Sequence, residues 1–489
     1  MQLWIGVHLP HLAIESFLPR WSMPRHETGF VVLETDRVVA LDRAAHSAGI
    51  VPGMRRGGVL TLVPDAVIRE RDLTREAELV RGVAFALLQF TPHVVLAEES
   101  VVLADVSASL RLFGGIRPLR RRAGETVTAF GVTATLAVAP TGQAAWLFAR
   151  SSGGIALSLR SVDRRLRRVP LPALPPARPY AEWFDGLGCA TADDVRRLPR
   201  AGLKKRCGTA LLDALDRATG AAPEVYEWLE LPPAFSARLE LPDRIEHAEA
   251  VLFAARRLIL QMTGWLSARQ LAIARFVLEL EHERGRAAVP PTAIEIALGE
   301  PTSREEHLVR LLKERLGRVE LAAPVIAVRL DAKDVREADA PSESLFPEPG
   351  GSPQDHARLT ELLVARLGAQ NVLKAAPVAD HRPEVAARWL PIGETVRSMP
   401  PPSSLPRPAW LLDSPVQLIM RGHRPFYGTP LRMVSPGERI EVGWQDGHPV
   451  TRDYFVAESE DAVHYWVFRE RVSAVQEREP RWFLHGLFG

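Results

Sequence analysis

Two segments rich in Pro, Ser, Glu and Gly divide this chain of 489 residues, and they constrain its fold more than any other feature of the sequence. They cover residues 335–355 and 396–407, and this composition favours extended linkers over a packed core. The chain before the first linker is too long for one hydrophobic core, so several domains are expected there. The residues after 407 are rich in aromatics and alternate as strands do, which predicts a compact β-rich domain.

Composition excludes several classes of protein. Hydrophobic residues make up 46% of the chain and charged residues 25%, as in an ordinary globular protein. No run of 18 apolar residues and no N-terminal signal pattern is present, so we expect no membrane partner and a cytoplasmic location. The two cysteines, Cys189 and Cys207, form no CxxC pair, which argues against a disulfide framework or a structural zinc site.

The distribution of positive charge says more than the net charge of +2. No lysine precedes Lys204, so the earlier positive side chains are arginines. Arginines cluster in residues 117–122 and 160–168. Such clusters suit contacts with phosphates, or they form a solvated face in an arginine-rich protein.

Strand-like and helical patterns alternate through the first 168 residues, which predicts an α+β domain. A proline-rich stretch at 170–179 then suggests a hinge, and a small helical module follows it. Residues 235–332 predict a second α+β domain, in which helices cover one face of a sheet. The expected order is a helix at 246–266, strands at 272–281 and 293–298, a helix at 304–316 and a strand at 324–330. Within 356–392 the pattern predicts a single helix, at 359–367.

Three stretches, in this order, resemble segments of the Y-family (lesion-bypass) DNA polymerases. Val39–Met54 is similar to part of the fingers, and Ser100–Ser107 looks like the palm strand that carries two catalytic carboxylates. Leu187–Pro199 resembles the helix-hairpin-helix of the thumb, where glycines let backbone N–H groups approach a phosphate. The resemblance covers residues 1–335, and the tail from Pro436 to Gly486 resembles the C-terminal region of polymerase-like proteins of bacterial mutasomes.

The resemblance implies a multidomain α+β fold with five parts. The expected parts are palm and fingers at 1–168, a helical thumb at 169–232, an α+β little finger at 233–335, a flexible tether with a short helix at 336–407, and a β-rich C-terminal domain at 408–489.

Phosphoryl transfer by such an enzyme needs two divalent metals held by carboxylates. The positions that carry this chemistry in the family fall on residues unable to perform it. The metal-binding positions fall on Gly6, His8, Ser100 and Val101, and the nucleotide-binding Tyr and Arg of the fingers fall on Arg43 and His46. The triphosphate-binding lysine is expected between Gln143 and Arg150, a stretch without lysine. We therefore expect no catalytic residue, no metal, no cofactor and no polymerase activity.

We expect this chain to bind DNA although it lacks catalytic activity. The resemblance assigns sequence-independent contacts with DNA phosphates to residues of the thumb and little finger. These residues are Gly186, Gly188, Lys204, Lys205, Arg206, Arg269 and Arg275.

The first linker contains an apolar pair in polar surroundings. Ser342, Leu345 and Phe346 resemble the short peptide by which bacterial polymerases bind the sliding clamp, with Ser342 in place of the usual Gln. The alternative is that Leu345 and Phe346 fold back on their own protein. By resemblance, the tail and the helix before it recruit an error-prone C-family DNA polymerase and a RecA-like accessory protein, in damage-induced translesion synthesis and mutagenesis.

Two other hypotheses about the function remain open. The chain is an active Y-family polymerase if a bulge places Glu99, next to Glu98, at the position of the missing carboxylate. Alternatively, the hairpin belongs to a repair nuclease or a structural DNA-binding protein, which does not predict clamp binding.

Overall fold

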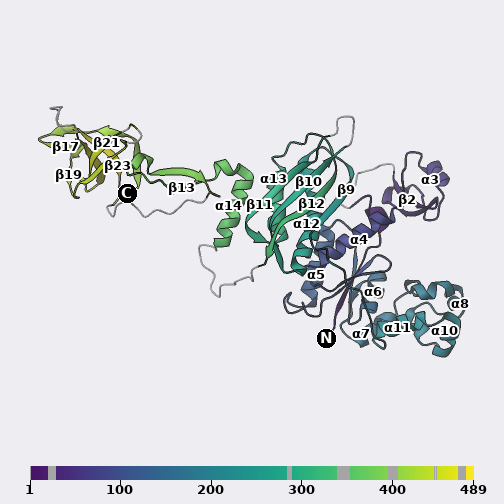
Figure 1. Ribbon diagram of the computed structural model, residues 1–489. Coiled ribbons are helices and arrows are strands. Elements are labelled where there is room, and N and C mark those ends of the chain that lie inside the picture. The colour runs from purple at the N-terminus through teal and green to yellow at the C-terminus, as the bar shows by residue number, and fades with distance from the viewer. Residues whose placement is uncertain are drawn as a thin grey trace. The chain divides into compact units, whose positions relative to one another are not determined.

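The computed structural model describes residues 2–19, 29–283, 289–338, 353–394, 406–444, 447, 449–471 and 481–488. The chain forms two compact units, residues 1–362 and 363–489 (Figure 1). The multidomain α+β architecture predicted from the sequence is confirmed, and so is the β-rich C-terminal region. No helix among the described residues is both long and apolar enough to cross a bilayer.

The first unit is built around a five-stranded sheet of order β5-β6-β1-β7-β8, which we call the palm. Its strands are β1 (Trp4–His8), β5 (Val94–Ala97), β6 (Val101–Asp105), β7 (Thr135–Ala139) and β8 (Gly154–Ile155). Strand β1 lies in the centre, antiparallel to β6 and β7, so its residues from Trp4 to Val7 are buried and apolar. Helices α4 (Leu73–Leu87) and α5 (Ile116–Ala129) pack on one face of the sheet, and α6 (Gly142–Arg150) packs on the other.

Two smaller parts adjoin the palm. The fingers are a three-stranded sheet of β2 (Phe30–Glu34), β3 (Arg37–Leu41) and β4 (Val67–Glu70), with helices α2 (Arg43–Ser47) and α3 (Arg56–Leu62). What we call the thumb begins with α7 (Leu159–Leu166), which lies before the predicted boundary at 169. It continues with η1 (Leu171–Ala173), η2 (Pro175–Tyr180), α8 (Ala181–Gly186), α9 (Ala192–Arg196), α10 (Arg200–Cys207) and α11 (Ala210–Thr219).

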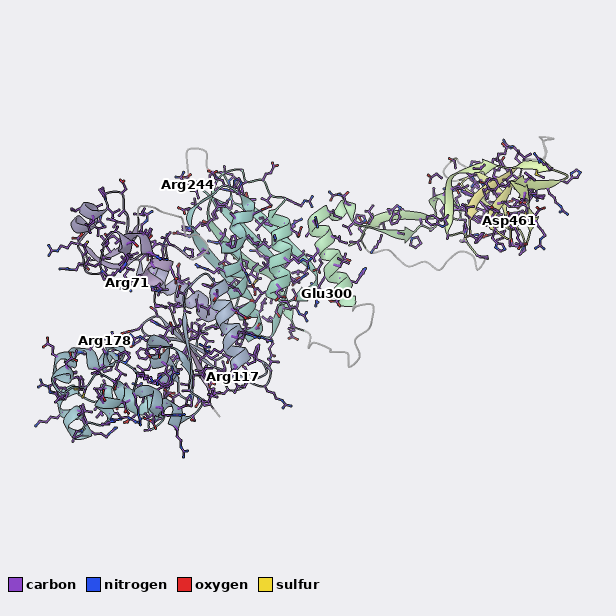
Figure 2. The ribbon with its side chains drawn as sticks, turned by 180° about the vertical axis from the view of Figure 1, so that it is seen from behind. Arg71, Arg117, Arg178, Arg244, Glu300 and Asp461 are labelled. Atoms are coloured by element: carbon purple, nitrogen blue, oxygen red, sulfur yellow. The ribbon has the colours of Figure 1, made fainter. Side chains whose placement is uncertain are left out.

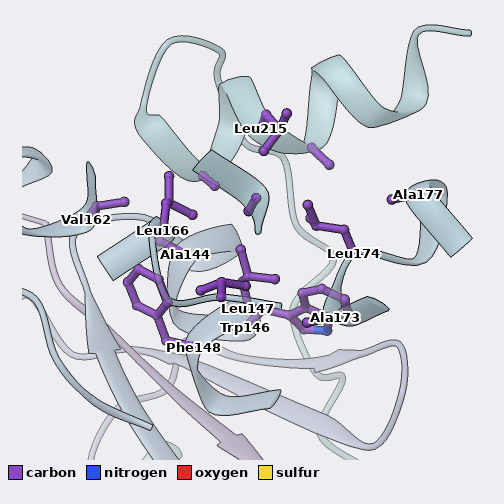
Figure 3. Packing of buried hydrophobic residues seen from close by; sticks show 14 of the residues in the cluster. Ala144, Trp146, Leu147, Phe148, Val162, Leu166, Ala173, Leu174, Ala177 and Leu215 are labelled. Atoms are coloured by element: carbon purple, nitrogen blue, oxygen red, sulfur yellow. The ribbon is translucent and has the colours of Figure 1, made fainter. Parts of the chain in front are cut away.

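Palm and thumb share one hydrophobic core. Side chains of α6, including Leu147 and Phe148, contact Val162, Leu166 and Leu215 of the thumb helices (Figure 3). The proline-rich stretch at 170–179 is therefore not a hinge, and that prediction is wrong. Its apolar residues, among them Leu171, Leu174 and Ala177, are buried in this core because the prolines shape two short 3₁₀ turns.

The little finger is a four-stranded sheet of order β11-β10-β12-β9, covered on one face by α12 and α13. Its elements are β9 (Ser236–Ile245), α12 (Val251–Ala268), β10 (Leu271–His282), β11 (Thr292–Thr302), α13 (Glu305–Leu316) and β12 (Val325–Glu337). The sequence predicted the elements from α12 onward in this order, but it did not predict β9.

The predicted tether holds more structure than one short helix. Helix α14 (Pro353–Leu367) contacts the edge strand β11 and helix α13. Its Glu361 carboxylate accepts hydrogen bonds from the Gly299 amide of β11 and from His307 Nε2 of α13, both at 2.7 Å. Figure 2 labels Glu300, which lies next to this contact. A hairpin of β13 (Leu373–Pro377) and β14 (Ala387–Pro391) follows. The hairpin escaped the sequence pattern because both strands are short and end at proline.

In the second unit, a six-stranded sheet forms the C-terminal domain. Its strands are β15 (Trp410–Gln417), β19 (Arg432–Met433), β20 (Glu438–Val442), β21 (Val450–Glu458), β22 (His464–Glu470) and β23 (Trp482–Leu487). Strands β16 (Ile419–Arg421), β17 (Arg424–Tyr427) and β18 (Thr429–Pro430) form a small separate sheet. Tyr454, Trp466 and His485 stack in the interior, and the Tyr454 hydroxyl lies 2.8 Å from His485 Nδ1.

Candidate functional site on the palm

The centre of the candidate site is Gly6 in β1. Helix α6 crosses so close that a Cβ atom on residue 6 would lie 2.5 Å from the Ala145 carbonyl oxygen and 2.8 Å from its carbon. Such distances are inside van der Waals contact, and backbone atoms of a helix cannot move aside cheaply. An aspartate at position 6 does not fit between these two elements, so the missing carboxylate is a requirement of the packing.

His8 follows on the same face of β1. It is partly buried, and burial lowers the pKa of its imidazole to about 4, an effect to which the positive charge of Arg150 adds and which Glu99 opposes. The side chain is therefore neutral near pH 7. A single neutral histidine supplies no charge to hold two divalent ions.

The turn between β5 and β6 carries the other candidate positions. Val101 is fully buried in the sheet, and Ser100 lies in the turn. Glu99 and Ser100 adopt left-handed backbone conformations, with φ of 55° and 59°. Two consecutive residues of this kind are costly without glycine, so the surrounding contacts must hold the turn in place.

Glu99 makes those contacts through two arginines. Its carboxylate accepts two hydrogen bonds from Arg178 of the thumb, at 2.6 and 2.8 Å, and forms an ion pair with Arg150 of α6. Figure 2 labels Arg178. The hydrogen bonds from Arg178, together with both positive charges, lower the pKa of Glu99 despite its partial burial. Arg150 also donates to the Ala173 carbonyl at 2.5 Å and lies over the Trp146 ring.

The cluster bears directly on whether Glu99 replaces a missing catalytic carboxylate. Glu99 is the acidic side chain that lies beside His8 at the end of the palm, but two guanidinium groups already surround it. A divalent ion placed here would face two positive charges at short range. Among the described residues, no group of three or more His, Cys, Asp or Glu side chains is arranged to hold a metal. The residues present therefore do not fit the two-metal site that the polymerase resemblance implies.

The predicted nucleotide-binding positions lie apart from this cluster. Arg43 and His46 are exposed on α2 in the fingers, where Asp42 caps the helix by accepting from the Ala45 amide. At α6 the first amides, Gly142 and Gln143, donate to the Glu224 carboxylate at 2.8 and 2.6 Å. Charge at this helix end is therefore balanced by the chain itself.

The glycine turn of the thumb is formed, but its amides already have acceptors. Gly188 has a φ of 69°, which a glycine adopts without strain. The amides of Ala190 and Thr191 donate to the Asp194 carboxylate, and that of Gly188 donates to the Asp185 carbonyl. A Cβ on Gly186 would meet nothing within 4 Å. Phosphate contacts through this turn stay a prediction, and they would have to displace existing hydrogen bonds.

The basic residues predicted to bind DNA differ in their availability. Lys204, Lys205 and Arg206 are exposed on α10, and no ion pair forms with them among the described residues. In the little finger, Arg275 pairs with Glu295 at 3.1 Å. Arg269 donates to the carbonyls of Pro232 and Pro233. The thumb therefore offers the freer cations.

Sequence reasoning missed Arg178, Arg150 and Glu224, whose roles depend on contacts between distant segments. The clamp-motif residues Ser342, Leu345 and Phe346 lie outside the described residues. Their assignment stays a prediction.

Comparison with known proteins supports the resemblance. Residues 20–150 match the model of the impB/mucB/samB family. Protein ImuB of Caulobacter vibrioides, in strains NA1000 / CB15N and ATCC 19089 / CIP 103742 / CB 15, is 27% identical over 468 residues, which cover 90% of this chain and all of ImuB. The chain is thus similar to ImuB over most of its length.

Solved structures with similarity include a ternary complex of Dbh and a Y-family DNA polymerase chimera built on Dbh. Both are 16% identical with a TM-score of 0.37. They cover 67% and 68% of this chain, and 98% and 99% of their own chains.

The palm cluster predicts a pH dependence of stability. His8 has a folded-state pKa of about 4, below its ordinary 6.5, so the unfolded chain binds more protons between these values. Its contribution to stability is present above pH 6.5 and is lost as the pH falls towards 4. Glu99, whose pKa is lowered, acts in the same direction at more acidic pH, since the unfolded chain then binds the extra proton.

We expect denaturant titrations from pH 7 to 4 to show falling stability, and His8→Gln to flatten this fall. His423, which is exposed, provides the control as His423→Gln. An unchanged slope in the His8 variant would contradict the assignment.

Proposed function

We propose that this chain is a polymerase-like protein without nucleotidyl-transfer activity that serves as a DNA-bound adaptor. It links the sliding clamp to an error-prone C-family DNA polymerase and a RecA-like accessory protein, in translesion synthesis and damage-induced mutagenesis. A cytoplasmic location is part of the proposal. Its similarity to ImuB over 90% of the chain supports the overall assignment.

The single observation that supports a loss of catalysis is that the Glu99 carboxylate is already paired with two arginines. Glu99, the acidic side chain beside His8, is held by Arg150 and Arg178, and the Gly6 position has no room for a carboxylate. The competing function, an active polymerase with a displaced carboxylate, would require Glu99 to leave both arginines and to bind metal instead. The ion pairs favour the adaptor.

Primer extension separates the two functions. We expect the purified protein to extend no primer with Mg²⁺ or Mn²⁺, because loss of metal-based charge stabilisation slows such chemistry by about a thousandfold or more. Glu99→Ala should leave this result unchanged. Robust extension that disappears in Glu99→Ala would establish the polymerase instead.

The DNA-binding part of the proposal is best supported by the exposed cations of the thumb. If Lys204, Lys205 and Arg206 each contact a phosphate, their share of the slope of log affinity against log salt should be roughly −3. Replacing all three with alanine should weaken binding at low salt and reduce the slope by about that amount. Fluorescence anisotropy with a primer–template duplex measures both quantities.

Arg481→Ala is the matched control, because Arg481 pairs with Glu470 in the C-terminal unit and is none of the predicted DNA contacts. It should leave the slope nearly unchanged. A binding affinity that stays flat between low and moderate salt would disprove phosphate contact.

Clamp binding is proposed from the sequence motif in the first linker. An extended peptide of this kind places a Leu and an aromatic residue in an apolar cleft, and such anchors carry most of the binding energy. We expect Leu345→Ala combined with Phe346→Ala to weaken clamp binding by more than about tenfold. Ser342→Gln, which restores the usual leading residue, should strengthen it. Normal clamp binding by the double variant would refute the motif, and surface plasmon resonance gives all three affinities.

The C-terminal unit is proposed to recruit the polymerase and the RecA-like protein. Its aromatic residues divide into a buried set, such as Tyr454 and Trp466, and an exposed set. Trp389 and Trp410 expose 69% and 70% of their surface, which is unusual for tryptophan and typical of contact residues. Pull-downs with residues 363–489 deleted, set against full-length protein, test whether either partner depends on this unit.

A further inference from the structure

Helix α12 of the little finger is buried on both sides. One side covers the little-finger sheet, and the other packs against α4 of the palm. Its buried residues run almost all the way round the helix. They are Val251, Ala254, Ala255, Arg257, Leu258, Ile259, Leu260, Met262, Thr263, Gly264, Trp265 and Leu266. A helix at the surface of a mobile domain would show a polar outer face, so this pattern indicates a layer inside a larger body.

The two helices touch at the backbone. A Cβ on Gly264 would lie 1.8 Å from the Phe85 carbonyl oxygen of α4. On α4, a Cβ on Gly82 would lie 2.6 Å from Phe130 and 3.2 Å from Gln261 of α12. A glycine on each helix permits this close crossing, and any larger residue would force the helices apart.

A buried arginine crosses the same interface. Arg257 of α12 is 5% exposed, and its Nε donates to the Phe130 carbonyl at 2.9 Å. The guanidinium also lies over the Phe130 ring, 4.8 Å from its centroid. Burial lowers the pKa of Arg257 to about 10, so the group stays charged at neutral pH. Separating the two domains would break the hydrogen bond from Arg257 to the Phe130 carbonyl. A hydrogen bond donated by a charged group is stronger than one between neutral groups.

The connection from thumb to little finger is fixed to α12 as well. Trp265 Nε1 and the Arg269 guanidinium both donate to the Pro232 carbonyl, at 2.9 and 3.0 Å. Elsewhere between palm and little finger, Arg75 of α4 pairs with Glu240 of β9. Polar contacts therefore hold α12 to the connecting segment and α4 to β9.

We propose that the little finger of this protein is a permanently packed layer of the palm and does not move as a jointed domain when DNA binds. Together with the Glu99–Arg178 contact between palm and thumb, this arrangement presents DNA with a preset surface. Only the identity of the ligand as DNA rests on the proposed function.

Hydrogen–deuterium exchange on the full chain tests the packing, with Gly264→Ala compared to Gly202→Ala. Both changes add one methyl group to a helical glycine, but nothing lies within 4 Å of a Cβ on Gly202. In Gly264→Ala we expect the protection of α4 and α12 to fall together, by more than about tenfold, since each helix covers the other. Strand β10 should keep its protection, and Gly202→Ala should change neither helix.

Arg257→Met decides the question if Gly264→Ala does not fold, because it removes the hydrogen bond while keeping most of the volume. It too should lower the protection of α4 and α12 together. Loss confined to α12 in the variant that folds would overturn the proposal.

A second measurement repeats the exchange experiment on the wild type with a primer–template duplex at saturation. We expect α4 and α12 to exchange as in the free protein, and a change of about tenfold or more in both helices would show a jointed domain. If the wild type binds no DNA at all, the proposed function fails, whereas the comparison of variants still tests the packing.

Discussion

The close approach of α6 to β1 is the contact on which the rest of the first unit depends. It is possible because residue 6 has no side chain, and it places α6 between the palm sheet and the thumb helices. Trp146, Leu147 and Phe148 can then face either the sheet or the thumb, and both domains bury their apolar surface on one helix. The same contact fills the space that an aspartate side chain at position 6 would require.

A second consequence concerns charge. In a polymerase palm, positive metal ions balance the carboxylates. Here the carboxylate of Glu99 is balanced by Arg150 and Arg178, which are covalently part of the chain. Arg178 belongs to the thumb, so neutralising Glu99 also joins the thumb to the hairpin of the palm. These ion pairs balance the charge of Glu99 and connect the palm with the thumb.

Sequence patterns were sufficient to predict those strands and helices that depend only on neighbouring residues in the chain. The alternation in Leu271–His282 and the helical spacing in Glu305–Leu316 predicted β10 and α13 within a residue or two, because one face of each is apolar. The resemblance to Y-family polymerases, and no local pattern, identified Gly6, Ser100 and Val101. The sequence could not reveal that Arg178 contacts Glu99, since the two are 79 positions apart and lie in different domains. For the same reason, the sequence could not show that Arg275 pairs with Glu295 or that Arg269 donates to the carbonyls of Pro232 and Pro233, and DNA contact by both arginines stays a prediction.

The proline-rich stretch at 170–179 shows why such errors are systematic. Proline marks both flexible linkers and rigid turns, and only tertiary contacts distinguish the two. Here the prolines direct Leu171 and Leu174 into the shared core and place Arg178 opposite Glu99. The segment that looked like a hinge is therefore a fixed joint between palm and thumb. Gly264 has a similar effect between palm and little finger, because it lets α12 approach the backbone of α4.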